Sequence, residues 1–181
     1  MKYYYILLLL LAGLLLSSHS MAQGSLAALD AKNGFRDAKF GMTRAQLKGM
    51  VLYKGDDFGN YIRPADRKMI GDIPLRTIRY RFHKGVLYSL FIVIDSRYKD
   101  QILETFRIAY GPGRNSPKLA GFQNWKGKKI ELSISHTTIA GIRALHIEMS
   151  NNYLTLLSNQ ENMDQENAIE HKMEQKRQSD L

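Results

Sequence analysis

Residues 75–95 read LRTIRYRFHKGVLYSLFIVID, and this stretch decides the fold of the chain. In its first half, residues 75–82, apolar side chains alternate with polar and basic ones. A period of two is typical of a strand with one buried face. The second half, residues 86–95, is rich in β-branched and aromatic residues and is apolar on both faces, as a central strand is. Because glycine tolerates a positive φ, Lys84-Gly85 supplies the turn, and the stretch predicts a β-hairpin.

Two helices are expected to precede strands. The first begins at Thr43, where Gln46 occupies the third position of a capping box, and ends near Leu52. The second begins at Ser96 and carries apolar residues three or four apart until Gly111-Pro-Gly stops it. Each of these helices is followed by a hairpin in the sequence pattern.

The alternation returns in the second half of the chain. Residues 121–135 predict a hairpin that turns at Lys126-Gly127-Lys128, and residues 142–149 predict one further strand. The expected fold class is therefore α+β, with an antiparallel sheet built of two helix-then-hairpin units and the helices on one face. Residues 54–72 are expected to form a long loop with one short strand, and a loop of this length is either functional or mobile.

The N-terminal segment, residues 1–22, is expected to be a signal peptide. Lys2 precedes an apolar run of about a dozen residues, and small residues favour cleavage after Ala22. An uncleaved membrane anchor is the alternative, but a helix that spans a bilayer needs about 20 apolar residues. We therefore expect a periplasmic or secreted protein that is not integral to the membrane after cleavage.

The mature chain divides into three parts. Residues 23–34 form an N-terminal lead, residues 35–157 an α+β domain, and residues 158–181 a polar tail. The tail contains too few apolar residues to build a core, so it is expected to be a solvated helix or disordered.

Composition narrows the possible partners and chemistry. The chain has no cysteine, which excludes disulfides, thiolate nucleophiles and cysteine-based zinc sites. Its formal net charge is +9, but residues 23–150 carry 22 Lys and Arg against 11 Asp and Glu, whereas residues 151–181 carry 3 against 6. A basic body with an acidic tail affects solubility and the choice of partners rather than the fold.

No catalytic set is recognisable. The mature histidines do not have the spacing of metal ligands, and the acids of the loop at 54–72 do not follow the EF-hand pattern. Arg63, Arg67 and Lys68 also oppose a cation in that loop. We therefore assign no catalytic residue, metal or cofactor, and expect a protein that is not an enzyme.

Basic residues are the feature that stands out. The candidate binding residues are Arg63, Arg67, Arg76, Arg79, Arg81 and Lys84. Arg79 and Arg81 are expected to point away from the helix-covered core, with the loop at 54–72 beside them. One interpretation is a solvated face that keeps the protein soluble. The other is a docking surface for an anionic envelope component or another envelope protein. Nucleic acid is not expected, because the basic face lacks interleaved aromatic residues.

Three short motifs resemble those of small exported bacterial domains of uncharacterised function. They are the run GFRDAKFGMT at 34–43, the run YRFHKGVL at 80–87, and Tyr110-Gly111-Pro112 followed by Trp125. The Phe-Gly-Met-Thr start is also similar to that of the outer-membrane-assembly small-lipoprotein family, whose fold is like that of a β-lactamase-inhibitor protein. This chain departs from that family in lacking a lipidated cysteine and in being longer. The resemblance implies a binding or assembly role and carries over no catalytic residue.

Three functional hypotheses follow. The first is a non-enzymatic exported binding or envelope-assembly module with a basic sheet face. The second is a small envelope hydrolase with a site in the loop at 54–72, which needs Asp66 or Asp72 near His136. The third is a structural protein whose acidic tail folds back on its basic body. The sequence does not define an oligomeric state.

Overall fold

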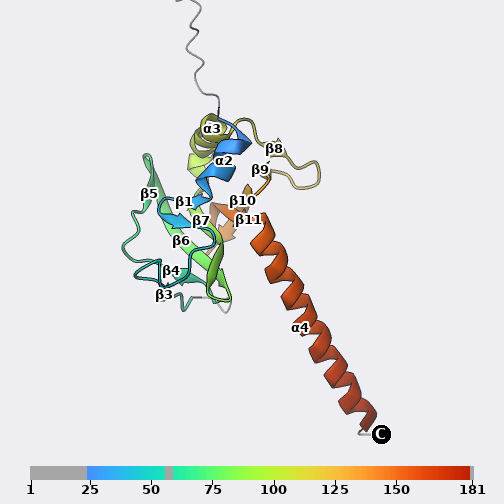
Figure 1. The fold of residues 1–181 in the computed structure, drawn as a ribbon. Coiled ribbons are helices and arrows are strands. Elements are labelled where there is room, and N and C mark those ends of the chain that lie inside the picture. The colour runs from blue at the N-terminus through green and yellow to red at the C-terminus, as the bar shows by residue number, and fades with distance from the viewer. Residues whose placement is uncertain (1–23, 56–58, 180–181) are drawn as a thin grey trace, which may run out of the picture.

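The structure is a computed structural model that describes residues 24–55 and 59–179 (Figure 1). The described elements, in chain order, are α2 (Leu26–Lys32), β1 (Gly34–Phe35), β2 (Ala38–Lys39), β3 (Val51–Leu52), β4 (Tyr61–Ile62), β5 (Met69–Ile70), β6 (Ile73–His83), β7 (Val86–Asp95), the 3-10 turn η1 (Ser96–Tyr98), α3 (Lys99–Tyr110), β8 (Arg114–Asn115), β9 (Gln123–Lys126), β10 (Ile130–Ile139), β11 (Ile142–Asn151) and α4 (Asn152–Ser179). The main sheet has nine strands in the order β3-β4-β6-β7-β11-β10-β9-β8, with β5 paired to β6. Its strand pairs are antiparallel, and the predicted α+β class is confirmed.

The hairpin of β6 and β7 is confirmed at the centre of the sheet. Its two turn residues, Lys84 and Gly85, have φ angles of +48° and +79°. A two-residue turn with both φ angles positive matches the right-handed twist of the strands that it joins. The β10–β11 hairpin turns in the same way at Ala140 and Gly141, with φ angles of +50° and +78°.

The core lies between one face of the sheet and helices α2 and α3. The register aligns Ile78, Ile92, Ile147 and Ile134 across four neighbouring strands, and each is at most 2% exposed. The two helices contribute Leu29, Ile102, Phe106 and Tyr110 to the same buried layer. The cysteine-free chain is thus stabilised mainly by apolar burial.

The helix expected from Thr43 to Leu52 is wrong. The capping box itself forms, since the Thr43 N–H donates to Gln46 Oε1 at 2.8 Å and the Leu47 N–H donates to the Thr43 carbonyl oxygen at 3.2 Å. The chain leaves this single turn at Gly49, whose φ is +79°, and continues into the short strand β3. The first hairpin therefore follows a turn and short strands, and the structure does not repeat a helix-then-hairpin unit.

The other helix predictions agree better with the structure. η1 and α3 follow β7 directly, and Asp95 Oδ1 accepts the Arg97 N–H at 3.0 Å to start η1. Gly111, with a φ of +82°, ends α3 as expected. The lead segment contains the helix α2, whose Leu29 is fully buried, so this segment is part of the core.

The tail is helical and leaves the body of the protein (Figure 1). α4 begins within the expected domain and runs through the boundary expected at residue 158. Near its start, Leu154 packs against the core and Ser158 is buried. Glu161 then forms an ion pair with Lys84, and its other carboxylate oxygen lies 3.0 Å from His83 Nε2. Beyond Glu161 the described side chains of α4 are exposed, so this part of the acidic tail does not fold back on the basic body.

The expected signal peptide, residues 1–22, lies outside the described residues. Within the ranges 24–55 and 59–179, no helix combines the length and the hydrophobicity needed to cross a bilayer.

Candidate functional site

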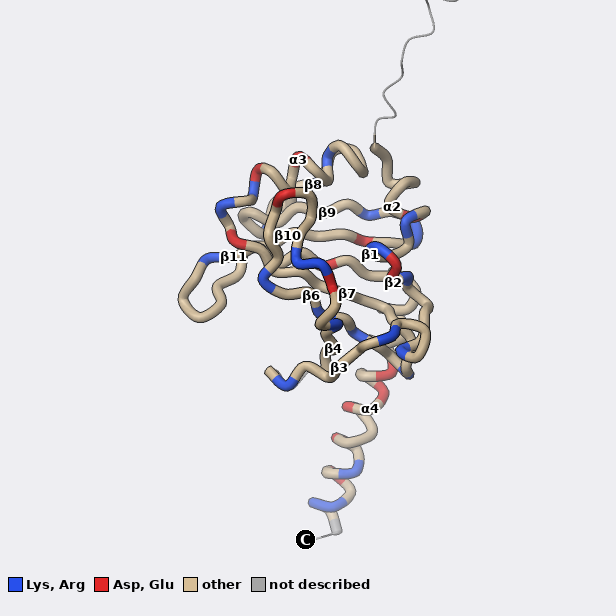
Figure 2. Tube along the Cα trace, turned by 90° about the vertical axis from the view of Figure 1, so that its left-hand side faces the viewer, with Lys and Arg blue, Asp and Glu red and all other residues tan. Residues whose placement is uncertain are grey.

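Polar side chains gather on the sheet face that is opposite α2 and α3. This surface, termed the open face, comprises Thr77, Arg79 and Arg81 of β6, Ser89, Phe91 and Val93 of β7, His146, Glu148 and Ser150 of β11, and Glu131, Ser133 and Ser135 of β10. The register places Arg79 opposite Phe91, Phe91 opposite Glu148, and Glu148 opposite Ser133. Figure 2 shows that basic residues are spread over the whole body, so the open face is defined by its arrangement and not by charge density alone.

The centre of the open face is a stack of aromatic rings and guanidinium groups. The Arg79 guanidinium carbon lies 4.1 Å from the ring centroid of Tyr53 and 5.4 Å from that of Phe91. The Arg81 guanidinium carbon lies 4.8 Å from the same Phe91 ring. Cation–π contacts of this kind hold the two guanidinium groups in place over the rings. Phe91 is 5% exposed because the two arginines cover it.

A polar set beside this stack orients Arg81. Its Nε donates to Asn60 Oδ1 at 3.1 Å, and its NH1 lies 3.7 Å from Glu148 Oε1. The Ser89 hydroxyl donates to the same Glu148 oxygen at 3.0 Å. The Glu148 carboxylate therefore contacts both Arg81 and Ser89 on the open face.

His146 borders the stack on its other side. Its ring centroid is 4.9 Å from that of Phe91, in an edge-on arrangement. Burial lowers the pKa of His146, and the nearby Arg81 and Arg79 lower it further, whereas Glu148 opposes them. The imidazole is consequently neutral at pH 7 and offers one donor and one acceptor.

The structure does not gather the six predicted binding residues on one surface. Arg79 and Arg81 lie side by side on the open face. Arg76 forms an ion pair with Asp95 at 3.0 Å, and Lys84 is at the hairpin tip with Glu161. The remaining two, Arg63 and Arg67, belong to a different cluster.

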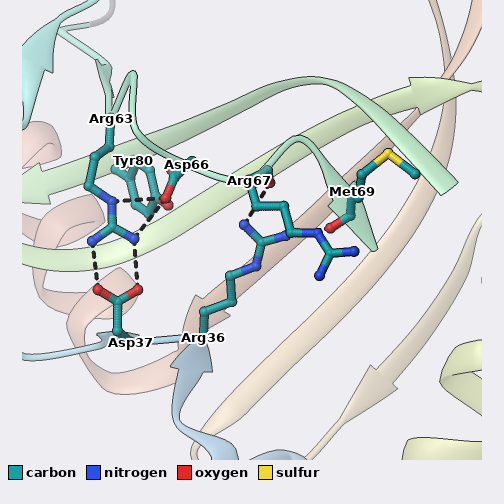
Figure 3. A network of polar contacts seen from close by, with 7 residues as sticks. All are labelled: Arg36, Asp37, Arg63, Asp66, Arg67, Met69 and Tyr80. Carbon is teal, nitrogen blue, oxygen red and sulfur yellow. Dashed lines mark hydrogen bonds and ion pairs between the residues drawn. The ribbon is translucent and has the colours of Figure 1, made fainter. Parts of the chain in front are cut away.

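That cluster is centred on Arg63 and lies beside β6 (Figure 3). Both terminal nitrogens of Arg63 donate to the Asp37 carboxylate at 2.7 Å, and Nε donates to Asp66 Oδ1 at 2.8 Å. The Tyr80 hydroxyl donates to the other Asp66 oxygen at 2.6 Å. The Arg63 side chain is only 12% exposed and that of Asp66 3%. These contacts satisfy the groups internally, so Arg63 acts as a structural residue.

The electrostatics of the cluster follow from the same contacts. The hydrogen bonds from Arg63 lower the pKa of Asp37, although partial burial opposes them. Burial raises the pKa of Tyr80, and its hydrogen bond to Asp66 raises it further. Both groups therefore keep their charge states, Asp37 ionised and Tyr80 neutral, throughout the neutral pH range.

Arg36 extends the cluster toward the loop at 54–72. It occupies the turn between β1 and β2 with a φ of +57°, and its guanidinium donates to the carbonyl oxygens of Arg67, at 2.7 Å, and Met69. The side chain of Arg67 is exposed. This turn therefore fastens the loop to the body, and Arg67 contributes through its backbone.

The groups required by the hydrolase hypothesis do not come together. Asp66 is held by Arg63 and Tyr80, and Asp72 is exposed. His136 lies on β10, which is separated from β6 by β7 and β11. Across the described part of the chain, no group of three His, Asp or Glu side chains is placed to hold a metal ion.

The sequence pattern did not identify four residues on or beside the open face: Tyr53, Phe91, His146 and Glu148. A signal existed for the last two, since they occupy the polar positions of an alternating strand, in phase with each other. Phe91 was hidden in an unbroken apolar run, and Tyr53 lies outside any periodic segment. Their meeting with Arg79 depends on the strand order.

Comparison of the chain with known protein families, with characterised proteins and with solved structures finds no match. Its function is therefore inferred from its own residues.

Proposed function

We propose that this protein is a non-enzymatic, exported binding module of the cell envelope, and that its open face docks a carboxylate-rich segment of another envelope protein. The observation that carries the proposal is the stack of Arg79 and Arg81 on Phe91, capped by Tyr53. The export and envelope parts are supported by the signal-like segment at 1–22.

The stack suits carboxylates for two physical reasons. Arg79 and Arg81 bring two like charges to the same ring, so an anion that binds at this point is attracted by both. A guanidinium also binds a planar carboxylate through two parallel hydrogen bonds, which an ammonium group cannot do.

A polypeptide partner is favoured over a lipid surface. Arg and aromatic side chains are enriched in protein–protein interfaces, where they supply much of the binding energy. Binding to anionic membranes relies instead on clustered basic residues together with an apolar side chain that enters the bilayer. On the open face, the described apolar residues Phe91 and Val93 are covered by their neighbours.

The test measures binding of the full chain to labelled poly-glutamate by fluorescence anisotropy, with vesicles of anionic phospholipid as a second arm. We expect saturable binding that weakens as salt rises, because salt screens exposed charges beyond about 10 Å at 0.1 M. The double variant Arg79→Glu/Arg81→Glu should lose at least about ten-fold in affinity, which corresponds to about 1.4 kcal/mol.

The matched control is Arg97→Glu/Arg107→Glu, which changes the net charge equally. These two arginines are exposed and lie on η1 and α3. Equal losses in both double variants would show that net charge alone drives binding and would refute the open face as the site. Binding to vesicles without binding to poly-glutamate would replace the proposed protein partner with a lipid surface.

A further inference from the structure

A cavity of about 110 Å³ lies on the opposite side of the sheet from the open face, beneath α3. Its sheet wall includes Ile92, Leu132 and Ile147, each at most 2% exposed. Phe106 and Ala109 of α3 and Phe35 of β1 form the opposite wall. The walls are almost wholly hydrocarbon, so the cavity provides few hydrogen-bonding partners for a water molecule.

The mouth of the cavity differs from its interior. Four of its lining residues retain solvent exposure: Ile70, Thr105 and Ala109 are half-buried, and Lys32 is exposed. The Thr105 hydroxyl donates to the Gln101 carbonyl oxygen within α3 at 2.8 Å, so its hydrogen-bonding needs are met by the helix. Lys32, in the last turn of α2, is the charged residue at this opening. Among the residues that the structure describes, no carboxylate forms an ion pair with its ammonium group.

We propose that this cavity binds a small monocarboxylate with a hydrocarbon tail of about four to six carbons. Apolar cavities of about 150 Å³ hold a six-carbon ring, so a cavity of this size fits the tail. The tail would occupy the space between α3 and the sheet, and the carboxylate would lie at the mouth beside Lys32. A site with apolar walls and one charged group at the mouth selects for this combination of tail and head group.

The single tryptophan of the chain gives a direct reporter. Trp125 is 1% exposed, and its ring centroid is 5.7 Å from that of Phe106, which lines the cavity. A ligand that contacts Phe106 changes the surroundings of Trp125. Hexanoate is the probe, and hexanol is the neutral probe with the same number of carbon atoms.

The experiment titrates the full chain with each probe and follows Trp125 emission and the midpoint of thermal unfolding. For the native chain, we expect a saturable emission change and a rise in the midpoint with hexanoate, since a ligand that binds only the folded state stabilises it. Lys32→Gln should weaken hexanoate about three-fold, as expected for one exposed ion pair, and leave hexanol within error.

Cavity filling provides the decisive variant. Ala109→Leu occupies the cavity and should abolish both responses, whereas Gln101→Leu, at an exposed position of the same helix, should retain them. Thr105→Leu serves the same purpose if Ala109→Leu fails to fold by circular dichroism.

The proposal is overturned if hexanoate produces no saturable response, or if a folded cavity-filling variant still responds. Equal affinity of the native chain for hexanoate and hexanol would overturn the role given to Lys32. Binding to poly-glutamate involves the other face of the sheet, so the two proposals fail separately.

Discussion

The Arg63 cluster allows a prediction whose size follows from burial. Replacing Arg63 with leucine removes the charged partner of Asp66, whose side chain is 3% exposed. Leaving a buried carboxylate without its cation costs about 3–5 kcal/mol. By contrast, Asp37→Asn removes the charge of a carboxylate whose side chain is 66% exposed. An exposed ion pair contributes only about 0–1 kcal/mol to the free energy of unfolding. Arg63→Leu should therefore lower the free energy of unfolding several-fold more than Asp37→Asn does.

Urea unfolding followed by circular dichroism measures this difference. With a slope of about 2 kcal/mol per molar, Arg63→Leu should lower the midpoint by roughly 1.5–2.5 M, and Asp37→Asn by less than about 0.5 M. The double variant Arg63→Leu/Asp66→Asn should recover part of the loss, because the uncompensated buried charge is gone while the Tyr80 hydroxyl keeps a partner. Equal losses of stability in Asp37→Asn and Arg63→Leu, or a double variant less stable than Arg63→Leu alone, would contradict the role given to the buried Asp66 carboxylate.

Three further outcomes are expected. Asp30→Ala should cost about 2 kcal/mol in urea unfolding, because the Asp30 carboxylate accepts three backbone N–H groups, from Lys128, Lys129 and Ile130, at 2.8–2.9 Å; a loss below about 0.5 kcal/mol would contradict this role. Burial lowers the pKa of His146, so the unfolded chain protonates first as pH falls. The free energy of unfolding should therefore be constant above about pH 7.5 and decrease below about pH 6.5. In His146→Gln this decrease should be less steep than in the native chain. In His171→Gln, which changes an exposed histidine as a control, it should have the same slope as in the native chain. Deleting residues 163–181 should change the free energy of unfolding by less than about 0.5 kcal/mol, because the described side chains of that segment are exposed. Deletion from Asn152 onward also removes Leu154, which packs against the core, and should clearly destabilise the chain in the same assay.

Local patterns were reliable where several neighbouring residues agreed. The β6–β7 hairpin combines alternation, a β-branched run and a turn with glycine, and each signal is contained within about twenty residues. The expected helix at Thr43 rested on a capping box and a loose apolar stripe, with Gly49 in its interior. The cap formed, but Gly49 adopted a positive φ and Leu47 found its place in the core after one turn. A capping box with a loose apolar stripe did not extend the helix past a glycine that adopts a positive φ.

The candidate sites were harder to predict because they join distant segments. Arg63 and Asp37 are 26 residues apart, and Tyr53 meets Arg79 across the same separation. The sequence pattern predicted that all six basic residues belong to one binding surface. It had no means of separating Arg63, which is enclosed by carboxylates, from Arg79 and Arg81, which are stacked on an aromatic ring.

Strand alternation and turn residues, both local properties of the chain, by themselves determined that this protein is an antiparallel α+β fold with arginines on one side of its central hairpin. Only the tertiary structure decided which arginines face outward, which aromatic rings hold them, and that a cavity remains between α3 and the sheet. The physical reason is that these features depend on the order of strands and on how helices pack over them, and many chains with the same local pattern can differ in both.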